Sequence, residues 1–502
     1  MSIFQHVAGR IEGSGCPDEE SGDRLFAALE QARELGATSI YQLHIGLSSV
    51  DPWQGLSAPL GREIAFLWHD GVAGLSLAAE GEVWNTQFPG SRRFDMASAA
   101  MEDIRGRFHR APVPACLKDM GVPLAFGGFS FSGLERSESS ANPWGKWSQG
   151  QLFVPQRLLY SRGDDSLSGK RGGGLFLHFR VEPDDTEAGV ISRVEKVLSE
   201  VSLGQAREQR AALSALSPET VHLESKRGFC ERVEAVKEAI SQQRDSNMGL
   251  KKVVLARADH LTAPGGCHFD PISTVCALRH QQPGAFTYAI SNGLGDVFLG
   301  ATPETLLRVS GGVVSTQALA GTAPRGGSQG EDDQFGEGLL DSQKERGEHQ
   351  LVVDAIVEGL APLCSRIEVP EVPQLVKLSH VQHLMTPVSG YLSRPVHLLD
   401  MINRLHPTPA LGGWPGEEAV SWIEEKEPLD RGWYGGPLGW LDQWGEGVFA
   451  VAIRSALVRR DSAWVYAGAG IVAESQPEAE WRETCLKLDT AMTGLCLKED
   501  SE

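Results

Sequence analysis

The segment AEWRETCLK, residues 479–487, places two carboxylates and an ammonium at helical spacing. If this segment is a helix, Glu480, Glu483 and Lys487 lie on one face within about 60° of arc. Two carboxylates on one face are candidate metal ligands. The alternative is a solvated or salt-bridged helix start, because acidic residues are favoured in the first turn of a helix.

A second helical pattern, residues 341–361, supplies another pair of acids. Glu345 and Glu348 project toward the apolar stripe that continues from Leu351. A carboxylate on a buried face needs a partner. Four acidic side chains that converge without His or Cys suit Mg²⁺, which takes hard oxygen ligands. The two helix starts are therefore candidate halves of one magnesium site.

Two further charges stand in apolar surroundings. Lys252 lies in the strand-like run KKVVLARA, residues 251–258. Glu304 follows the strand-like run DVFLGA, residues 296–301. Burial disfavours the charged form of each group, which makes Lys252 a candidate base and Glu304 a candidate proton donor. The alternatives are that Lys252 extends to solvent at the strand end and that Glu304 pairs with Arg308.

Three other features are candidate ligand contacts. Arg454 lies in an apolar run and is suited to binding a carboxylate through two hydrogen bonds, with a buried salt bridge as the alternative. His383 is a candidate donor, although a lone His is more often structural. GAGIVA, residues 468–473, matches a dinucleotide-binding pattern, but Pro477 delays the next helix. Close approach of the glycine backbone to a ligand is the better interpretation.

The segments that must position these residues alternate without the regular spacing of βαβ units, so the sequence predicts an α+β fold. Further strands are expected at 447–458 and 463–472, and further helices at 416–427 and 478–496. The Gly-rich, acidic segment 321–338 is predicted to be a loop.

Composition limits the class of protein. The chain has 502 residues and a formal net charge of −20, which argues against a nucleic-acid surface. No apolar run reaches membrane-spanning length, and the N-terminus lacks the apolar region of a secretory signal. The eight cysteines are scattered without a Cys-x-x-Cys pair. These features predict a cytoplasmic protein with reduced thiols.

Ten blocks of the sequence, read in order, resemble the chorismate-utilising enzymes, which include isochorismate synthase, salicylate synthase and anthranilate synthase component I. The blocks are KKVVLAR, FLGATPETLLR, ALAGTAPRG, SQKERGEHQLVVDAI, VQHLMTP, LHPTPALGG, DRGWYGGPLGW, AIRSA, YAGAGIV and EWRETCLK. The resemblance implies two stacked antiparallel sheets wrapped by helices. We expect residues 1–215 to be an N-terminal scaffold portion and residues 216–502 to be the chorismate-binding catalytic portion.

The resemblance also implies site residues and a Mg²⁺ cofactor. The principal metal ligands would be Glu348 and Glu483, with Glu345 and Glu480 as nearby acids. Lys252 matches the base that activates water, and Glu304 matches the acid that protonates the leaving hydroxyl. The positions that match substrate contacts are Thr322, His383, Ala410, Leu411, Tyr434, Arg454, Gly468, Gly470 and Lys487.

Three positions favour isochorismate synthase within this group. Anthranilate synthases usually carry Gln at the place of Lys252 and use ammonia. Aminodeoxychorismate synthases carry a nucleophilic Lys at the place of Ala320, whose methyl group forms no covalent bond. Ala410 and Leu411 resemble the corresponding residues of isochorismate synthases. The implied reaction is Mg²⁺-dependent conversion of chorismate to isochorismate, and the expected pathway leads to menaquinone or phylloquinone.

Several alternatives stay open. A salicylate synthase adds pyruvate elimination to the same first step, and a siderophore-pathway isochorismate synthase makes the same product. A non-catalytic chorismate-binding protein has no need for an acid–base pair. An ammonia-using synthase would need a glutaminase, which we do not expect. The expected partner is the small-molecule substrate alone, with no nucleic acid and no membrane, and the expected assembly is a monomer or weak homodimer.

Overall fold

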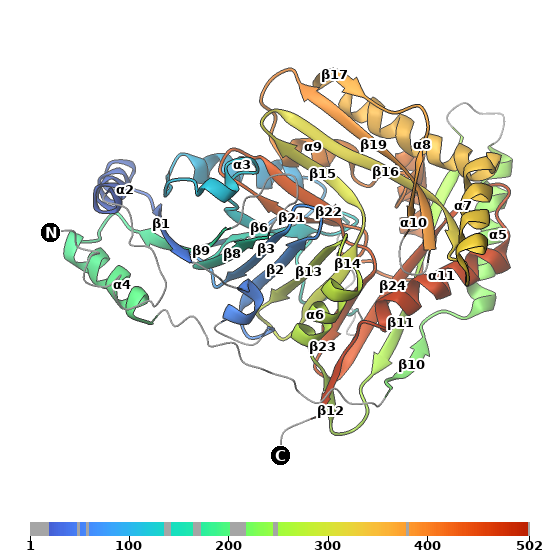
Figure 1. Cartoon of the computed structure of the whole chain (residues 1–502), viewed down its shortest axis with the longest axis horizontal. Coiled ribbons are helices and arrows are strands. Elements are labelled where there is room, and N and C mark those ends of the chain that lie inside the picture. Colours follow the sequence, from blue (N-terminus) through green and yellow to red (C-terminus); the bar gives the residue numbers. More distant parts are fainter. Residues whose placement is uncertain are drawn as a thin grey trace.

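Two large β-sheets, mostly antiparallel, form the centre of the protein (Figure 1). The computed structural model describes residues 20–47, 51–56, 60–134, 142–163, 172–200, 217–243, 249–377 and 381–499. The first sheet runs in the order β10 (Glu219–His222), β11 (Lys252–Thr262), β24 (Ser462–Ile471), β23 (Ser455–Arg459), β14 (Val297–Thr302), β13 (Phe286–Asn292), β2 (Ile64–Asp70), β3 (Leu75–Glu80), β8 (Arg157–Arg162), β9 (Gly172–Val181), β1 (Ser39–Leu47) and β5 (Phe108–His109), and β20 (Gly413–Trp414) also pairs with β11.

The second sheet is smaller and again combines early and late segments of the chain. Its order is β17 (Cys364–Glu368), β19 (Val381–Leu392), β16 (Val313–Pro324), β15 (Thr305–Ser310), β22 (Gly447–Val451), β21 (Pro437–Leu441), β6 (Ala125–Phe129), β7 (Gly150–Val154) and β4 (Trp84–Gln87), and β18 (Gln374–Lys377) pairs with β19. A short separate pair joins β12 (Cys267–Phe269) to β25 (Leu497–Glu499).

The two sheets face each other across an aromatic core. Trp68 and Tyr288 of the first sheet belong to the same buried cluster as Phe126 and Trp440 of the second sheet. Burial of such large side chains on both inner faces supplies the main driving force for stacking the sheets. The predicted α+β architecture is therefore confirmed.

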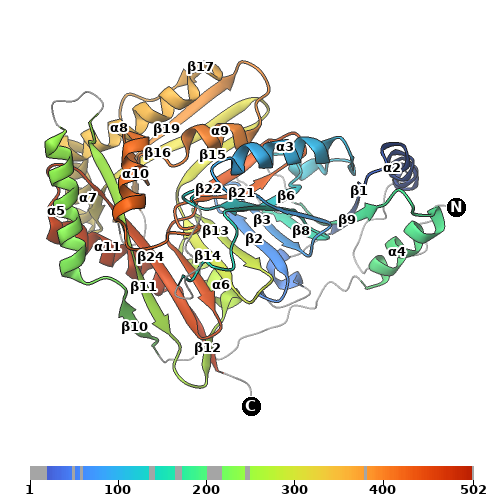
Figure 2. The ribbon, with the colours of Figure 1, turned by 180° about the vertical axis from the view of Figure 1, so that it is seen from behind.

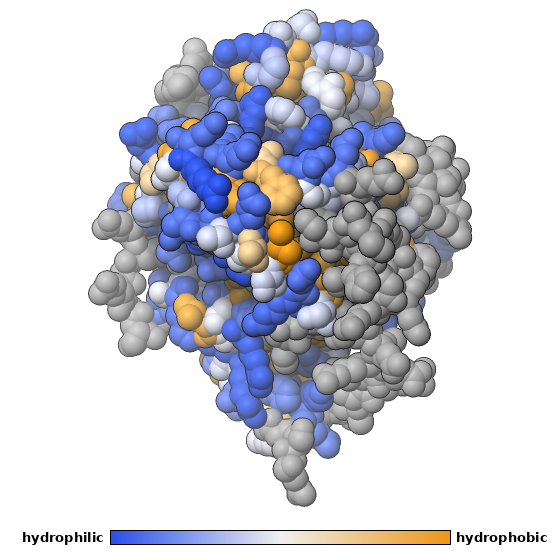
Figure 3. Space-filling view, turned by 90° about the vertical axis from the view of Figure 1, so that its left-hand side faces the viewer, coloured by the Kyte–Doolittle hydropathy of each residue, from blue (hydrophilic) through white to orange (hydrophobic). Residues whose placement is uncertain are grey.

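Helices cover the outer faces of the sheets and the end that carries β11 (Figures 1 and 2). Their bounds are α2 (Ser21–Leu35), α3 (Arg93–Arg105), α4 (Glu187–Glu200), α5 (Lys226–Gln242), α6 (Pro271–Gln281), α7 (Gln329–Asp341), α8 (Gln343–Leu360), α9 (Leu398–Leu405), α10 (Gly416–Lys426) and α11 (Pro477–Met492). Hydrophilic side chains dominate the coloured surface on the side that carries α2 and α4 (Figure 3). Among the described residues, no helix has the length and apolar character needed to cross a membrane.

Two neighbouring links join the sheets. Pro303 and Glu304 connect β14 of the first sheet to β15 of the second, and residues 452–454 connect β22 of the second sheet to β23 of the first. The links are hydrogen-bonded at both ends, by Val451 N to Glu304 O (3.1 Å) and by Ala301 N to Arg454 O (3.3 Å). Glu304 and Arg454 thus stand side by side where the sheets meet.

Three sequence expectations need correction. The run 447–458 was expected to be one strand, but its chain changes sheets at Arg454, where φ is +52°. The predicted loop 321–338 instead contains the end of β16 and most of α7, because Ser328 caps the helix by accepting a hydrogen bond from Glu331 N. The helix expected at 478–496 ends at Met492. The predicted boundary after residue 215 lies outside the described residues.

Candidate active site

Strands β11 and β24 form the floor of the candidate site. Their register places Val254 opposite Gly470 and Ala256 opposite Gly468. Side chains alternate along a strand, so Lys252, Val254 and Ala256 share one face of β11. The glycines of β24 leave space above this floor. A Cβ atom at Gly470 would lie 2.8 Å from both the Cε of Lys252 and an Oε atom of Glu348.

Lys252 is buried at the start of β11. Its side chain is 1% exposed, and its Nζ lies 2.8 Å from Oε1 of Glu348 in α8. The alternative in which Lys252 extends to solvent is therefore wrong. The close contact with Gly470 explains why a residue without a side chain is needed at that point in β24.

Glu304 is also buried, with 5% of its surface exposed. Burial raises the pKa of its carboxyl to about 7, although Lys252, Arg454 and Lys487 act in the opposite direction. The predicted alternative partner, Arg308, instead forms an ion pair with Asp70. Glu304 therefore retains a proton near neutral pH, as a general acid requires.

Arg454 presents a buried guanidinium without a protein counter-ion. Its residue is 9% exposed, and among the described residues no carboxylate lies within ion-pair distance of it. Burial lowers the pKa of Arg454, partly offset by Tyr434, Glu483 and Glu304. A buried cation needs an anion or strong acceptors. The predicted buried salt bridge is thus absent from the described part of the chain, and the geometry favours a ligand carboxylate.

Helices α8 and α11 bring their acidic starts together with three lysines. Glu483 lies 2.6 Å from the Nζ of Lys487, which also donates to the Gly468 carbonyl at 2.8 Å. Lys344 lies between the helices, 3.3 Å from Glu345 and 3.9 Å from Glu480.

The pKa values of these carboxyls reflect the crowding of negative charge. Burial raises the pKa of Glu480 to about 7, assisted by Glu483 and Glu348. Burial and Glu348 also raise the pKa of Glu345. Burial acts upward on the pKa of Glu483 too, but Lys487 outweighs it and holds this pKa below its ordinary value. The four carboxyl groups at the starts of α8 and α11 therefore outnumber the lysine ammonium groups that lie beside them.

The donor set fits a hard divalent cation by its chemistry. All four predicted ligands offer carboxylate oxygens, and the mutual repulsion of these groups is what a cation would relieve. Within the described residues, however, no three acidic or His/Cys side chains already converge on one point, because the carboxylates are turned toward lysines. The predicted magnesium-binding roles therefore stay predictions.

The other predicted contacts lie around the same space. Tyr434 is buried, its ring stacks on Tyr466 at 5.3 Å, and burial raises its pKa to about 12. Its hydroxyl would lie 3.1 Å from a Cβ atom at Gly468. The proximity of Tyr434 to the glycine floor therefore connects the DRGWYGG segment to β24.

His383 and Thr322 meet at an irregularity between β16 and β19. Thr322 Oγ1 lies 3.1 Å from His383 Nδ1, which also lies 3.2 Å from the Gly321 carbonyl. Burial lowers the pKa of His383 to about 3, so the ring is neutral at physiological pH. The nitrogen Nδ1 then donates to the carbonyl of Gly321, whose φ of +80° marks the bulge.

Ala410 and Leu411 lie in the segment before β20. Leu411 is buried with 6% exposure, while Ala410 is partly buried and packs against the same apolar cluster. The segment is held to β11 because Val254 N donates to Gly412 O at 2.9 Å. The segment that carries the predicted substrate contacts Ala410 and Leu411 is therefore fixed directly to the strand that carries Lys252.

The family profile described as "Chorismate binding enzyme" matches residues 27–496. The chain belongs to the chorismate-binding enzyme family. The match spans nearly all of the chain, including the N-terminal strands that complete both sheets. The family resemblance inferred from the ten sequence blocks is therefore confirmed.

Two relatives within this family cover the chain to different extents. "Isochorismate synthase MenF" of Bacillus subtilis is 32% identical over 478 residues, which cover 94% of this chain and 96% of the relative. "Salicylate biosynthesis isochorismate synthase" of Pseudomonas aeruginosa is 45% identical over 260 residues, which cover 52% of this chain and 53% of the relative.

A solved structure shares the fold. The structure of MenF, described as the menaquinone-specific isochorismate synthase from Escherichia coli, superposes with a TM-score of 0.72 and covers 93% of this chain and 100% of its own. The two sequences are 24% identical, so the likeness shows the fold alone.

Two contributors to this chorismate-binding fold were missed from the sequence. Lys344 was not singled out, although it stands one residue before Glu345 and contacts acids of both helices. The partners of Arg431 in DRGWYGG were also missed. A cation beside a predicted metal ligand was a readable signal in the first case, whereas the second depends on contacts distant in sequence.

Proposed function

We propose that this chain is an isochorismate synthase, which adds water at ring position 2 of chorismate and releases the hydroxyl at position 4. The family membership and the near-complete alignment with an isochorismate synthase support this activity. One structural observation carries the proposal: Lys252 and Glu304 are both buried, and Lys252 lies close enough to Glu304 to influence the pKa of its carboxyl.

The two groups have complementary tasks. Lys252 accepts a proton from the attacking water, while Glu304 gives a proton to the departing hydroxyl. The buried positions of both groups keep bulk water from competing for these protons. Glu304 stands on the link between sheets, whereas Lys252 begins β11, so a ligand between them is approached by base and acid from different elements.

The cations of the site suit a substrate with two carboxylates. Arg454 offers a guanidinium that has no counter-ion among the described residues, and Lys487 offers an ammonium anchored at Gly468. Tyr434 adds a hydroxyl donor above the glycine floor. Planar guanidinium and carboxylate groups pair through two parallel hydrogen bonds, which fixes orientation as well as charge.

Mg²⁺ bound at Glu348, Glu483, Glu345 and Glu480 would neutralise their mutual repulsion and bind a substrate carboxylate as a Lewis acid. The carboxylates of α8 and α11 approach that position from two helices, and Lys344 balances part of their charge. The neutral ring of His383 and the hydroxyl of Thr322 lie beside Glu345, because Thr322 N donates to Glu345 Oε2 at 3.2 Å, and both groups are suited to orienting the substrate ring.

We further propose that the product enters the menaquinone or phylloquinone pathway. The alignment with MenF of Bacillus subtilis extends through both portions of the chain, whereas the alignment with the salicylate-biosynthesis relative covers about half. The enzyme is proposed to be cytoplasmic and to act as a monomer or weak homodimer without a glutaminase subunit.

Incubation with chorismate and Mg²⁺, followed by mass identification of the product, tests the activity. An isomer of unchanged mass is expected. Salicylate together with pyruvate would instead establish a salicylate synthase, and incorporation of labelled ammonia would establish an amino-transferring synthase. If the protein binds chorismate but forms no product, it is a non-catalytic chorismate-binding protein. Rescue of menaquinone synthesis in a strain lacking its isochorismate synthase tests the pathway.

A further inference from the structure

The outer edge of β11 lacks a strand partner over its middle section. β20 pairs with Lys252 and Val253, and β10 pairs with residues 259–262. Between them, Val254 N donates to Gly412 O and Ala258 O accepts from Leu223 N, but no described strand pairs with Val254 O or with the backbone groups of Ala256. Buried backbone groups need hydrogen-bond partners, so something else must supply them.

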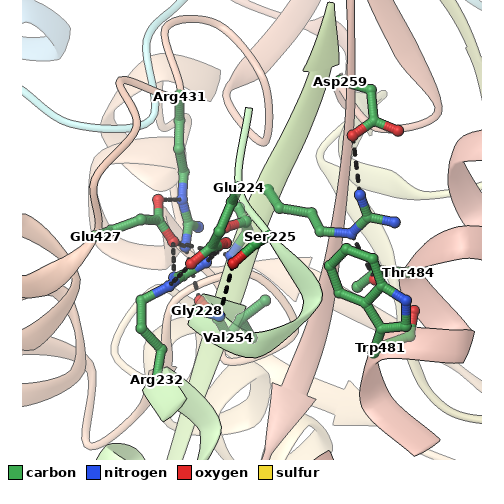
Figure 4. Close-up of polar contacts among 12 residues, drawn as sticks. Glu224, Ser225, Gly228, Arg232, Val254, Asp259, Glu427, Arg431, Trp481 and Thr484 are labelled. Atoms are coloured by element: carbon green, nitrogen blue, oxygen red, sulfur yellow. Dashed lines mark hydrogen bonds and ion pairs between the residues drawn. The ribbon is translucent and has the colours of Figure 1, made fainter. Parts of the chain in front are cut away.

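Side chains supply the partners of these remaining groups (Figure 4). Ala256 N donates to Oε2 of Glu427 at 2.8 Å, and Ala256 O accepts from Arg232 at 3.0 Å. Val254 O accepts from Nη2 of Arg431 at 2.7 Å. A buried acid and two arginines thus replace a missing strand beside the segment that carries Lys252.

Arg431 uses its whole guanidinium in these contacts. It binds both carboxylate oxygens of Glu427, at 2.6 and 2.7 Å, and donates to Leu411 O at 3.0 Å. Its guanidinium carbon lies 4.2 Å from the ring centre of Phe131. The side chains of Arg431 and Glu427 are 4% and 2% exposed, so water does not substitute for these contacts.

Arg431 also contacts Tyr434, a predicted substrate contact, through its backbone carbonyl. The carbonyl of Arg431 accepts a hydrogen bond from Tyr434 N at 2.9 Å. Arg431 therefore connects Leu411, Tyr434 and β11, while the outer end of the network is closed by Arg232 of α5, which binds Glu224. The other predicted contact residues are held by different elements.

We propose that Glu427 and Arg431 are positioning residues, which set the distance of Leu411 and Tyr434 from β11 and thereby shape the chorismate-contacting side of the site. This inference rests on the proposed function. Neither residue needs to touch substrate, because each acts through the groups it holds. Lys252 is also held by Glu348 and by the pairing of β11 with β24, and Glu304 is held by the link between sheets, so the chemical step is expected to be affected less than binding.

Arg431→Lys is the sharpest perturbation. A lysine keeps the charge but cannot reach the carboxylate, the Leu411 carbonyl and the Val254 carbonyl together. We expect KM for chorismate to rise about tenfold while kcat stays within about threefold of wild type, the pattern of lost binding that is common to ground state and transition state.

Arg162→Lys is the matched control. Arg162 is similarly buried, and it donates to the Cys116 carbonyl at 2.7 Å and to Asp119 at 2.6 Å, but it lies on β8 away from β11 in the first sheet. The Arg162→Lys substitution should lower Tm about as much as Arg431→Lys does, without changing KM for chorismate. Glu427→Gln provides a second test, because the amide keeps one acceptor while losing the charge. Its KM should rise in the same direction by a smaller factor.

The outcomes separate the claims. A folded Arg431→Lys variant with KM within twofold of wild type overturns the positioning role, as does an equal KM increase in Arg162→Lys. If neither Arg431→Lys nor Glu427→Gln yields folded protein, the pair serves folding and the positioning claim is rejected. Failure of the proposed function is visible separately, because wild-type protein would then form no isochorismate.

Discussion

The proton held by Glu304 gives the protein a stability that depends on pH. Its pKa rises from 4.5 in an unfolded chain to about 7 in the folded protein, chiefly because the carboxyl is buried. Each tenfold change in proton affinity is worth about 1.4 kcal/mol, so this group contributes about 3 kcal/mol. Because the folded pKa is the higher one, that contribution is fully present below pH 4.5 and is lost as pH rises through 7.

Glu304→Gln removes this dependence, since an amide does not titrate in this range. Between pH 5 and pH 8 the free energy of unfolding of the variant should gain about 2.5 kcal/mol relative to wild type, because other carboxyls cancel in the difference. Urea unfolding of both proteins at several pH values measures it. Turnover should fall by a factor of about 10²–10⁴, the usual contribution of a general acid.

Asp442 provides a matched control. Burial raises its pKa to about 6, and it accepts hydrogen bonds from the backbone of a turn between β21 and β22 rather than from the site. Asp442→Asn should change stability with pH in the same direction while leaving turnover unaltered. A stability difference between wild type and Glu304→Gln that is flat from pH 5 to pH 8 would refute the assignment of a buried, protonated Glu304.

Three further perturbations test the remaining groups. Lys252→Ala should reduce turnover by about 10²–10⁴ while chorismate binding, measured calorimetrically, is largely retained; near-normal rates would contradict a base at this position. Arg454→Gln should raise Tm without substrate, because it removes a buried charge for which the described part of the chain offers no counter-ion, and should raise KM about a hundredfold; an unchanged KM would exclude binding of a substrate carboxylate by Arg454. Added Mg²⁺ at about 100 times its Kd should stabilise wild type by about 2.7 kcal/mol. Glu483→Gln should lose most of that gain, whereas Glu478→Gln, an exposed substitution on the same helix, should keep it.

Strong local patterns made much of the scaffold predictable. Strands β11, β14 and β24 were visible as β-branched and small apolar runs, and α8, α10 and α11 as helical patterns. The acids of α8 and α11 and the two buried charges at Lys252 and Glu304 were visible because charge in apolar surroundings is uncommon. Their roles came from the family resemblance and remain predictions.

The missed features were hidden either by uniform apolar composition, by misleading glycines or by contacts between distant segments. The run 447–458 is apolar on both sides of Arg454, so periodicity gave no sign that its two halves belong to different sheets. In α7, glycines suggested a loop, but the Ser328 cap and the acids of the first turn stabilise a helix. The contact between Glu427 and Ala256 joins residues 171 positions apart, which no local pattern encodes.

The paired links between the sheets connect Glu304, the proposed proton donor, to Arg454. Glu304 O accepts a hydrogen bond from the last residue of β22, and Arg454 O accepts one from Ala301 of β14, so sliding one sheet over its neighbour should move Glu304 and Arg454 together. A small relative motion of the two sheets would then change the distance of Glu304 and Arg454 from Lys252, while the distance between Glu304 and Arg454 stays the same. Backbone hydrogen bonds thus couple the positions of these two residues.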